Sequence, residues 1–270
     1  MRKLIPFIVL LAIITIPMFS IAGENIFFLH NSVGRYVIDY GSVRAHIEYS
    51  NSLNDTNLEF WDHDYNHIGL TDPSGEIVGS YNIPNDDTDP AGLHYLWTTS
   101  NSAKDAILAN HDVIVFKSCY SASDITSNTQ LQQFKEWYYD IVDVLETHAD
   151  KTFLLMSPPP KHRLGTSSNE ADRAREFASW MGSRELLGGI TNVHYFDMFD
   201  FLAHPDDGSP ASNMLRYDYE KFHNAYDSHP NLACNQALGM VLADELISIS
   251  NSAVQENQDS SWGATKVLFK

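Results

Sequence analysis

Two segments near opposite ends of the chain contain side chains that together could perform nucleophilic catalysis. Ser32 follows the apolar run of residues 25–29, where a strand would end and present the hydroxyl. His229 lies in a segment Asp-Ser-His-Pro-Asn that begins at Asp227. A serine hydroxyl is a poor nucleophile until a base removes its proton, and a histidine oriented by a carboxylate is such a base. These residue types could therefore supply a nucleophile (Ser32), a base (His229) and an orienting carboxylate (Asp227) for hydrolysis.

Each of these residues also has a purely structural explanation. A serine between a strand and a helix commonly caps the helix N-terminus, and His229 could be a surface histidine in the turn before the last helix. His30 lies two residues before Ser32, so on an extended chain the two side chains would share a face. His30 could then line the pocket or assist the oxyanion, or it could be a polar residue that ends a buried strand.

Alternating strand-like and helix-like segments would position these residues. Short apolar runs predict five strands, at residues 25–29, 58–61, 112–116, 152–156 and 193–196. Apolar side chains at helical spacing predict helices at residues 102–109, 130–148, 170–187 and 232–249. Buried apolar strands separated by helices are typical of a parallel sheet covered on both faces. We therefore expect a three-layer α/β/α sandwich with a mostly parallel sheet of about five strands.

Two long polar segments, residues 62–96 and 203–226, interrupt this alternation and are expected to be loops. Long loops that leave the strand ends of such a sheet tend to form the functional site. The acidic stretch at residues 82–90 could bind calcium through oxygen ligands, but its ligand spacing is incomplete, which favours a solvated loop. Five aromatic residues of this region could stack on sugar rings or pack in the core: Trp61, Tyr65, Tyr81, Tyr95 and Trp97.

The order of these blocks resembles the SGNH or GDSL-like hydrolase superfamily over roughly residues 25–249. The serine after the first strand, the strand and proline loop at residues 152–160, the helix at residues 170–181 and the Asp-x-His-Pro segment at residues 227–230 are similar to blocks of that family. The resemblance implies a flavodoxin-like three-layer fold and ester hydrolysis through an acyl-enzyme. It also supports Ser32 as nucleophile.

The chain departs from the family pattern where the oxyanion hole would form. The lead-in Gly-Asp-Ser is replaced by His30-Asn31-Ser32. The second block is best matched by Asn66-His67-Ile68-Gly69, so the resemblance implies that the Gly69 N–H helps to bind the oxyanion, with Asn66 beside it. In the family an asparagine follows the strand of the third block. In this chain the strand at residues 112–116 is followed by Lys117 and Ser118, without that asparagine. Lys117, Ser118 or a backbone N–H would have to replace it.

The last block also differs, because Asp227 comes two residues before His229 and the family places its aspartate three before. Asp227 could still orient the imidazole. The alternatives are a backbone carbonyl or another carboxylate, with Ser32 and His229 acting as a dyad. The resemblance implies no cofactor and no catalytic metal.

The first 22 residues have the layout of a secretory signal peptide. Arg2 and Lys3 precede an apolar run that ends near Phe19, and Ser20-Ile21-Ala22 offers the small residues of a cleavage site. An uncleaved membrane anchor is the alternative, but prolines interrupt the run. We expect a secreted or periplasmic domain at residues 23–250, without stable membrane insertion after cleavage. A polar linker and short tail would follow at residues 251–270.

Composition limits the kinds of partner. The formal net charge of −18 repels phosphate backbones, so the sequence argues against nucleic-acid binding. Hydrophobic residues make up 43% of the chain, enough to form one substantial core. Cys119 and Cys234 are the only two cysteines, and in an oxidising compartment they could form an intramolecular disulfide or remain two separate buried thiols.

These observations predict an exported serine ester hydrolase. An aromatic and acidic loop region on an exported protein favours an O-acylated carbohydrate, such as an acetylated glycan, as substrate. A non-catalytic glycan-binding protein with the same fold is the main alternative, since the segments that would form the oxyanion hole differ from the family pattern. A metal-dependent hydrolase that uses the aspartates of residues 82–90 is a third hypothesis.

Overall fold

The computed structural model describes residues 24–268, so the predicted signal peptide lies outside the described residues. A central sheet has the strand order β4-β3-β2-β1-β5-β6-β7. Its strands are β1 (Asn25–Leu29), β2 (Glu59–His63), β3 (Leu70–Thr71), β4 (Ile77–Gly79), β5 (Val113–Lys117), β6 (Thr152–Met156) and β7 (Val193–Phe196). Neighbours from β2 to β7 pair in parallel, whereas β3 and β4 add antiparallel at the β2 edge.

The predicted fold class is confirmed, with a correction to the number of strands. All five predicted strands are present, and the short β3 and β4 extend the sheet to seven. Both lie inside the segment at residues 62–96 that we expected to be a loop. Strands of two and three residues are too short to show a periodic pattern. The helix α3 (Pro90–Thr98) also begins in this segment.

The middle strands are apolar because both of their faces are covered. Every residue of β5 is buried. Alternate residues of β1 enter two separate cores, with Ile26 and Phe28 in one and Phe27 and Leu29 in the other. Period-two alternation between two apolar layers makes each strand hydrophobic at nearly every position, as in other parallel sheets.

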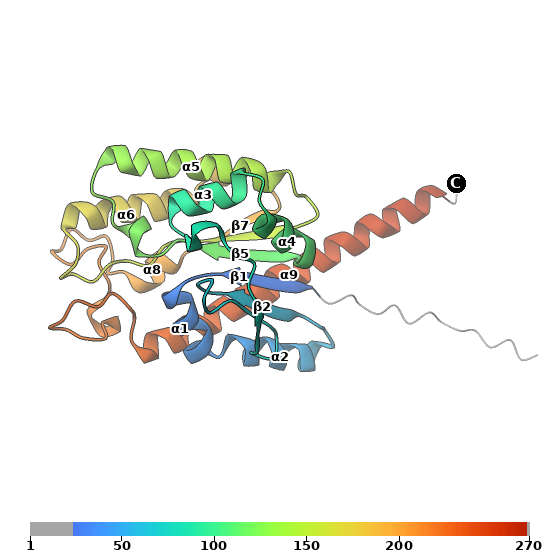
Figure 1. The fold of residues 1–270 in the computed structure, drawn as a ribbon, viewed down its shortest axis with the longest axis horizontal. Coiled ribbons are helices and arrows are strands. Elements are labelled where there is room, and N and C mark those ends of the chain that lie inside the picture. Colours follow the sequence, from blue (N-terminus) through green and yellow to red (C-terminus); the bar gives the residue numbers. More distant parts are fainter. Residues whose placement is uncertain (1–23, 269–270) are drawn as a thin grey trace, which may run out of the picture.

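Helices form the two outer layers (Figure 1). The remaining helices are α1 (Ser32–Gly41), α2 (Val43–Asn54), α4 (Ser102–Asn110), α5 (Asn128–Glu146), α6 (Ser168–Met181), α7 (Arg184–Leu187), α8 (Met198–Leu202) and α9 (Leu232–Leu268). Short 3-10 helices lie at Pro84–Asp86, Tyr120–Ser123 and Tyr217–Tyr219. One core joins the sheet to α1, α2, α8 and α9, and the other joins it to α3 through α7.

The last helix, α9, crosses α1 at very close range. Gly41 of α1 meets Gly239 of α9, and a Cβ added to Gly239 would lie 2.4 Å from the Gly41 Cα. In the described chain α9 continues to Leu268, so the linker predicted after residue 250 is instead a helical extension that projects beyond the sheet (Figure 1). The stretch Leu232–Ser252 is long and apolar enough to cross a membrane, but 44% of its most apolar window is buried inside the protein.

Of the two alternatives for the cysteines, the structure has separate thiols, since Cys119 and Cys234 are both free. Cys234 is buried in the core between α9 and the sheet, and Cys119 follows β5 and packs against the same core. Burial raises the pKa of the Cys234 thiol to about 12. This cysteine is therefore a protonated, apolar packing residue.

Candidate active site

Ser32, His229 and Asp227 form one continuous hydrogen-bonded arrangement. The Oγ of Ser32 lies 2.9 Å from Nε2 of His229. On the other side of the ring, Nδ1 of His229 lies 2.7 Å from Oδ1 of Asp227. The predicted residues are thus brought together in the order nucleophile, imidazole and carboxylate. Both distances lie within hydrogen-bond reach.

Local structure places Ser32 at the edge of the sheet. β1 ends at Leu29, and α1 begins at Ser32 after only two connecting residues. The extended Asn31 precedes the helix, and its carbonyl accepts the backbone N–H groups of Gly34 and Arg35. The first backbone N–H groups of a helix have no partner within the helix, so the Ser32 N–H is available at the positive end of the helix dipole.

His229 is held in a loop that two hydrogen bonds fix from outside the site. The carbonyl of Ser228 accepts the hydroxyl of Tyr120. The Ser228 hydroxyl oxygen accepts the backbone N–H of His162 at 2.9 Å. The His229 ring packs against the edges of two tyrosine rings, with centroid distances of 5.4 Å to Tyr36 and 5.6 Å to Tyr120. These contacts fix the position and tilt of the imidazole.

Asp227 is the orienting carboxylate despite its shortened spacing. Its Oδ1 accepts the backbone N–H of His229 at 3.0 Å as well as the ring N–H. Partial burial opposes ionisation, but the hydrogen bonds from His229 and the charges of His229 and Lys221 outweigh it and lower the pKa of Asp227. The carboxylate therefore stays ionised at neutral pH. An ionised Asp227 selects the His229 tautomer with hydrogen on Nδ1, which leaves Nε2 free to accept the Ser32 proton.

His30 does not line a pocket, contrary to one of our two expectations. The side chain is fully buried, with Nδ1 3.0 Å from the carbonyl of Asn31 and Nε2 2.9 Å from Oδ2 of Asp62. Both partners are hydrogen-bond acceptors when Asp62 is ionised. Arg44 also pairs with this carboxylate. Together His30, Asp62 and Arg44 form a buried charged cluster beneath the first turn of α1.

Asn66 and Gly69 do not offer the oxyanion donors that the family resemblance implies. The backbone N–H of Gly69 already donates to the carbonyl of Tyr65 at 2.8 Å. Gly69 has a φ of +98°, and a Cβ there would lie 2.1 Å from the carbonyl oxygen of Gly79, so the glycine serves the turn into β3. The side chain of Asn66 bonds the backbone N–H and carbonyl of Ile83. Both residues therefore have structural roles.

Lys117 and Ser118 are buried where β5 ends. The Ser118 hydroxyl lies 3.2 Å from the hydroxyl of Tyr138, which packs on the far side of the sheet from α1. Lys117 is fully buried, and its Nζ has no hydrogen-bond partner among the described residues. Burial lowers the pKa of the Lys117 ammonium, against the opposing charges of Cys119 and Asp64. The structure shows neither side chain bonded to Ser32.

Tyr65 is the site residue whose role the sequence did not reveal. It was expected to stack on a sugar or to pack in the core. Its hydroxyl instead lies near Ser32, and its ring stacks on that of His67 with a centroid distance of 5.7 Å. Burial raises the pKa of the Tyr65 hydroxyl. Tyr65 follows β2 by two residues, and that position at a strand end is the only signal in the sequence.

The acidic stretch at residues 82–90 is used for local structure. Asp86 accepts the backbone N–H of Asn66, Asp87 accepts that of Asp89, and Asp89 accepts the hydroxyl of Ser121. Within residues 24–268 we find no cluster of three or more His, Cys, Asp or Glu side chains arranged to hold a metal ion.

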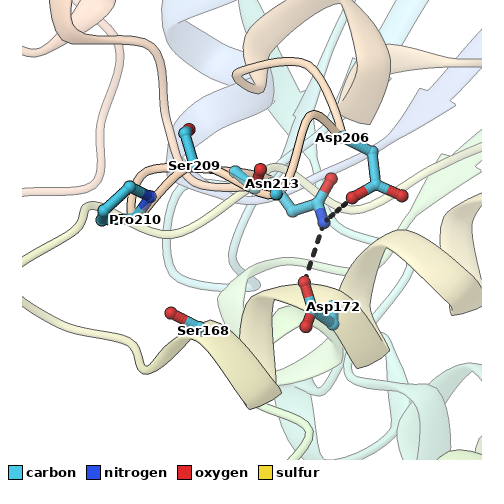
Figure 2. A pocket seen from close by; sticks show the side chains of 8 residues that line it. Ser168, Asp172, Asp206, Ser209, Pro210 and Asn213 are labelled. Carbon is cyan, nitrogen blue, oxygen red and sulfur yellow. Dashed lines mark hydrogen bonds between the residues drawn. The ribbon is translucent and has the colours of Figure 1, made fainter.

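A separate acidic pocket lies at the N-terminus of α6 and the loop after α8 (Figure 2). Its lining residues are Ser168, Asp172, Asp206, Gly208, Ser209, Pro210, Ser212 and Asn213. The Asn213 amide donates to Asp172 at 2.9 Å and to Asp206 at 3.0 Å, and its oxygen accepts from Arg175. None of the triad residues lines this pocket.

Comparison with known proteins finds distant structural similarity only. No family model and no curated protein sequence matches the chain. Similar solved structures include a carbohydrate acetylesterase from Sinorhizobium meliloti (12% identity, 84% of this chain and 99% of that one, TM-score 0.46). A GDSL-like lipase from Bacteroides thetaiotaomicron (10% identity, 84% and 89%, TM-score 0.45) and an aryl esterase from M. smegmatis (13%, 84% and 99%, TM-score 0.42) are similar too. Likeness at this level of identity and TM-score says nothing of the activity or the substrate of this chain.

Proposed function

We propose that the protein is a serine ester hydrolase that acts through an acyl-enzyme formed on Ser32. The observation that supports this most directly is the unbroken line of contacts from Asp227 through His229 to Ser32, at 2.7 Å and 2.9 Å. Three residues of the right types, in the right order and at hydrogen-bond distances, are what this chemistry requires.

Each residue has a defined part in the proposed reaction. Nε2 of His229 removes the proton of Ser32 Oγ as the oxygen attacks the ester carbonyl carbon, and the carbonyl π electrons move onto its oxygen. The Ser32 N–H at the start of α1 stabilises that oxyanion. His229 then gives its proton to the leaving alcohol, which departs with the electrons of the cleaved C–O bond. Water, deprotonated by His229, attacks the acyl-enzyme and restores Ser32 with release of the acid.

We propose an O-acylated carbohydrate as the substrate class. We also propose that the protein is exported, with cleavage of the signal peptide near Ala22. Tyr36 and Tyr120 pack against His229, so aromatic side chains border the proposed base. Flat apolar rings suit the C–H faces of sugars. Neutral phenols also suit an uncharged acyl sugar better than an anionic substrate, given the acidic surface.

The test uses the purified mature chain with p-nitrophenyl acetate and with an acetylated oligosaccharide as substrates. Wild type is expected to hydrolyse the ester and to be labelled on Ser32 by a fluorophosphonate probe. Ser32→Ala should lose both properties, while Ser52→Ala, an exposed serine on α2, should keep them. Equal hydrolysis by wild type and Ser32→Ala, with no labelling of Ser32, would contradict the proposal.

A non-catalytic glycan-binding role is the second candidate. It is favoured by one observation, namely that the Gly69 amide and the Asn66 side chain are both engaged elsewhere. Retained binding of an acetylated oligosaccharide without turnover or labelling would support this role. Exhaustive EDTA treatment distinguishes the metal-dependent hypothesis, since only a metal-dependent activity should be lost.

A further inference from the structure

The Ser32 N–H belongs to the same peptide unit as the Asn31 carbonyl. A trans peptide is planar, so its C=O and its N–H point in opposite directions. Any contact that fixes the Asn31 carbonyl therefore also fixes the direction of the Ser32 N–H, the group that would bind the oxyanion. Two backbone N–H groups of α1, from Gly34 and Arg35, donate to this carbonyl oxygen at 2.8 Å and 3.3 Å.

The side chain of His30 is a third donor to the Asn31 carbonyl. Nδ1 of its ring lies 3.0 Å from the carbonyl oxygen. Because a carbonyl oxygen can only accept, Nδ1 carries the hydrogen of this contact. The two backbone bonds are those that begin any helix, whereas the imidazole is an addition particular to this chain. The ring is fully buried, so water does not compete for the carbonyl.

The His30 ring is held between the sheet and the first turn of α1. Its Nε2 lies 2.9 Å from Oδ2 of Asp62 on β2, and Arg44 of α2 pairs with the same carboxylate. On the side of α1, a Cβ added to Gly34 would lie 2.3 Å from the His30 Cβ and 2.9 Å from Nδ1. A glycine at this position thus lets the helix rest directly on the imidazole, which keeps Nδ1 directed at the carbonyl.

We propose that His30 is a positioning residue, which orients and polarises the Asn31–Ser32 peptide for oxyanion binding. This inference rests on the proposed function of Ser32. The imidazole N–H draws electron density toward the Asn31 oxygen, so the Ser32 N–H at the other end of the peptide becomes a stronger donor. The contact exists before a substrate binds, and no reorganisation is needed when negative charge develops. His30 neither touches the substrate nor transfers a proton.

Two substitutions of His30 separate the roles of its two ring nitrogens. The side-chain NH₂ of an asparagine takes nearly the place of Nδ1, and that of a glutamine takes nearly the place of Nε2. His30→Asn therefore keeps a donor for the Asn31 carbonyl and loses the contact with Asp62, whereas His30→Gln does the reverse. His111→Gln is the control, since it removes a buried histidine that stacks on Phe27 in the other core.

We expect His30→Gln to lower kcat on p-nitrophenyl acetate by at least about tenfold, less than the roughly 10²-fold to 10³-fold cost of losing an oxyanion donor itself, with KM changed by less than about threefold. The inhibition constant of phenylboronic acid, whose adduct with Ser32 places an oxygen in the oxyanion site, should rise by a factor of at least about five. His30→Asn and His111→Gln should keep kcat within about threefold of wild type. Urea unfolding of all three variants separates an effect on stability from this pattern.

The outcomes separate this inference from the proposed function. If wild type is active and labelled on Ser32 but His30→Gln keeps kcat and boronate affinity within about threefold, His30 is not a positioning residue and the esterase proposal stands. Equal losses of kcat in His30→Asn and His30→Gln would also overturn the inference, because only one of them keeps the donor to Asn31. If wild type itself has neither turnover nor labelling, the proposed function fails and this inference fails with it.

A measurement on wild type tests the contact without any substitution. In a proton-coupled ¹⁵N spectrum of the histidine-labelled protein, Nδ1 of His30 should carry a hydrogen. An Nδ1 without hydrogen cannot donate to the Asn31 carbonyl and would overturn the inference even if the His30 variants failed to fold.

Discussion

The Nε2 atom of His229 lies 2.9 Å from the Oγ atom of Ser32, although 197 positions separate the two residues in sequence. Two helices explain this proximity. α1 begins at Ser32, α9 begins at Leu232, and both pack in the same core on one face of the sheet. The N-terminus of one helix therefore presents the hydroxyl, and the turn before the other presents the imidazole.

The link between Asp227 and His229 leads to our first prediction. Asp227→Asn should lower kcat about 10²-fold to 10⁴-fold on p-nitrophenyl acetate, because an amide can donate to Nδ1 and select the tautomer that cannot accept the Ser32 proton. Lys221→Met is the matched control, since Lys221 contacts only the outer oxygen of Asp227, at 3.6 Å. A drop of less than about fivefold in Asp227→Asn would show that the carboxylate does not set the tautomer.

The three residues could be predicted because they adjoin detectable elements and lie in segments that resemble blocks of a known family. Ser32 follows a fully apolar strand, and His229 and Asp227 precede an apolar-periodic helix. In such a fold strand ends and helix starts meet at one edge of the sheet. The same reasoning gave the five longer strands, but it could not detect β3, which has only two residues.

Whether Gly69 and Asn66 are free to bind an oxyanion could not be predicted, because that depends on contacts that no local pattern records. Gly69 matched the family block, but whether its N–H is free depends on the turn that joins it to Tyr65. The engagement of the Asn66 side chain depends in the same way on Ile83, 17 residues further along the chain. Likewise, the sequence could not decide between a disulfide and two separate thiols, because that depends on how Cys234 packs in the core beside α9.

The unpaired Lys117 ammonium predicts an unusual stability effect. Lys117→Met should stabilise the protein at pH 7 by about 1–3 kcal/mol, because it removes a buried charge that has no hydrogen-bond partner among the described residues. Since burial lowers the Lys117 pKa, the unfolded chain binds the proton more tightly, and wild-type stability should rise with pH toward the ordinary lysine range. Lys117→Met should lack that rise.

Urea unfolding at pH 7 and at pH 9.5 measures both effects. Lys151→Met is a matched control, since this lysine pairs with Asp112 at 3.3 Å at the other end of the strands. A Lys117→Met variant less stable than wild type at pH 7 would show that the ammonium has a favourable partner in solution.

His111 provides a pH-dependent test of the core around Phe27, which joins the sheet to α3 through α7. Burial lowers its pKa to about 4, and its ring stacks on Phe27 with a centroid distance of 4.6 Å while Nε2 accepts the Tyr81 hydroxyl. The unfolded chain protonates this histidine near its ordinary pKa, so wild type should lose stability as pH falls from about 6.5 toward 4. The contribution of His111 to that loss is about 2–3 kcal/mol.

His111→Gln keeps an acceptor for Tyr81 but does not titrate. Its stability should be lower at pH 7, owing to the lost stacking, and should fall less steeply between pH 7 and pH 4.5. His67→Gln, at an exposed position, should follow the wild-type slope. Parallel slopes for wild type and His111→Gln in urea unfolding would refute a neutral, buried His111.

The crossing of α1 and α9 gives the last prediction. Alanine is normally favoured over glycine inside a helix by about 1 kcal/mol. At Gly239, however, the new Cβ would lie 2.4 Å from the Gly41 Cα and 2.7 Å from the Val37 carbonyl oxygen, and backbone atoms cannot move aside as a side chain can. Gly239→Ala should therefore destabilise the protein by about 2–3 kcal/mol, whereas Gln236→Ala, exposed on the same helix, should change stability little.

Gly239→Ala also tests whether the packing of α1 against α9 affects the active site. Because α1 begins with Ser32 and α9 follows His229, a wider crossing should lengthen the hydrogen bond between them and lower kcat even in the fraction of Gly239→Ala that is folded. Urea unfolding and kcat on p-nitrophenyl acetate, measured on the same preparation, test the two effects separately. An increase in stability would mean that the helices do not approach this closely. A stability loss with unchanged kcat would mean instead that the position of His229 is set by its own loop, through Tyr120 and Ser228, and not by the helix crossing.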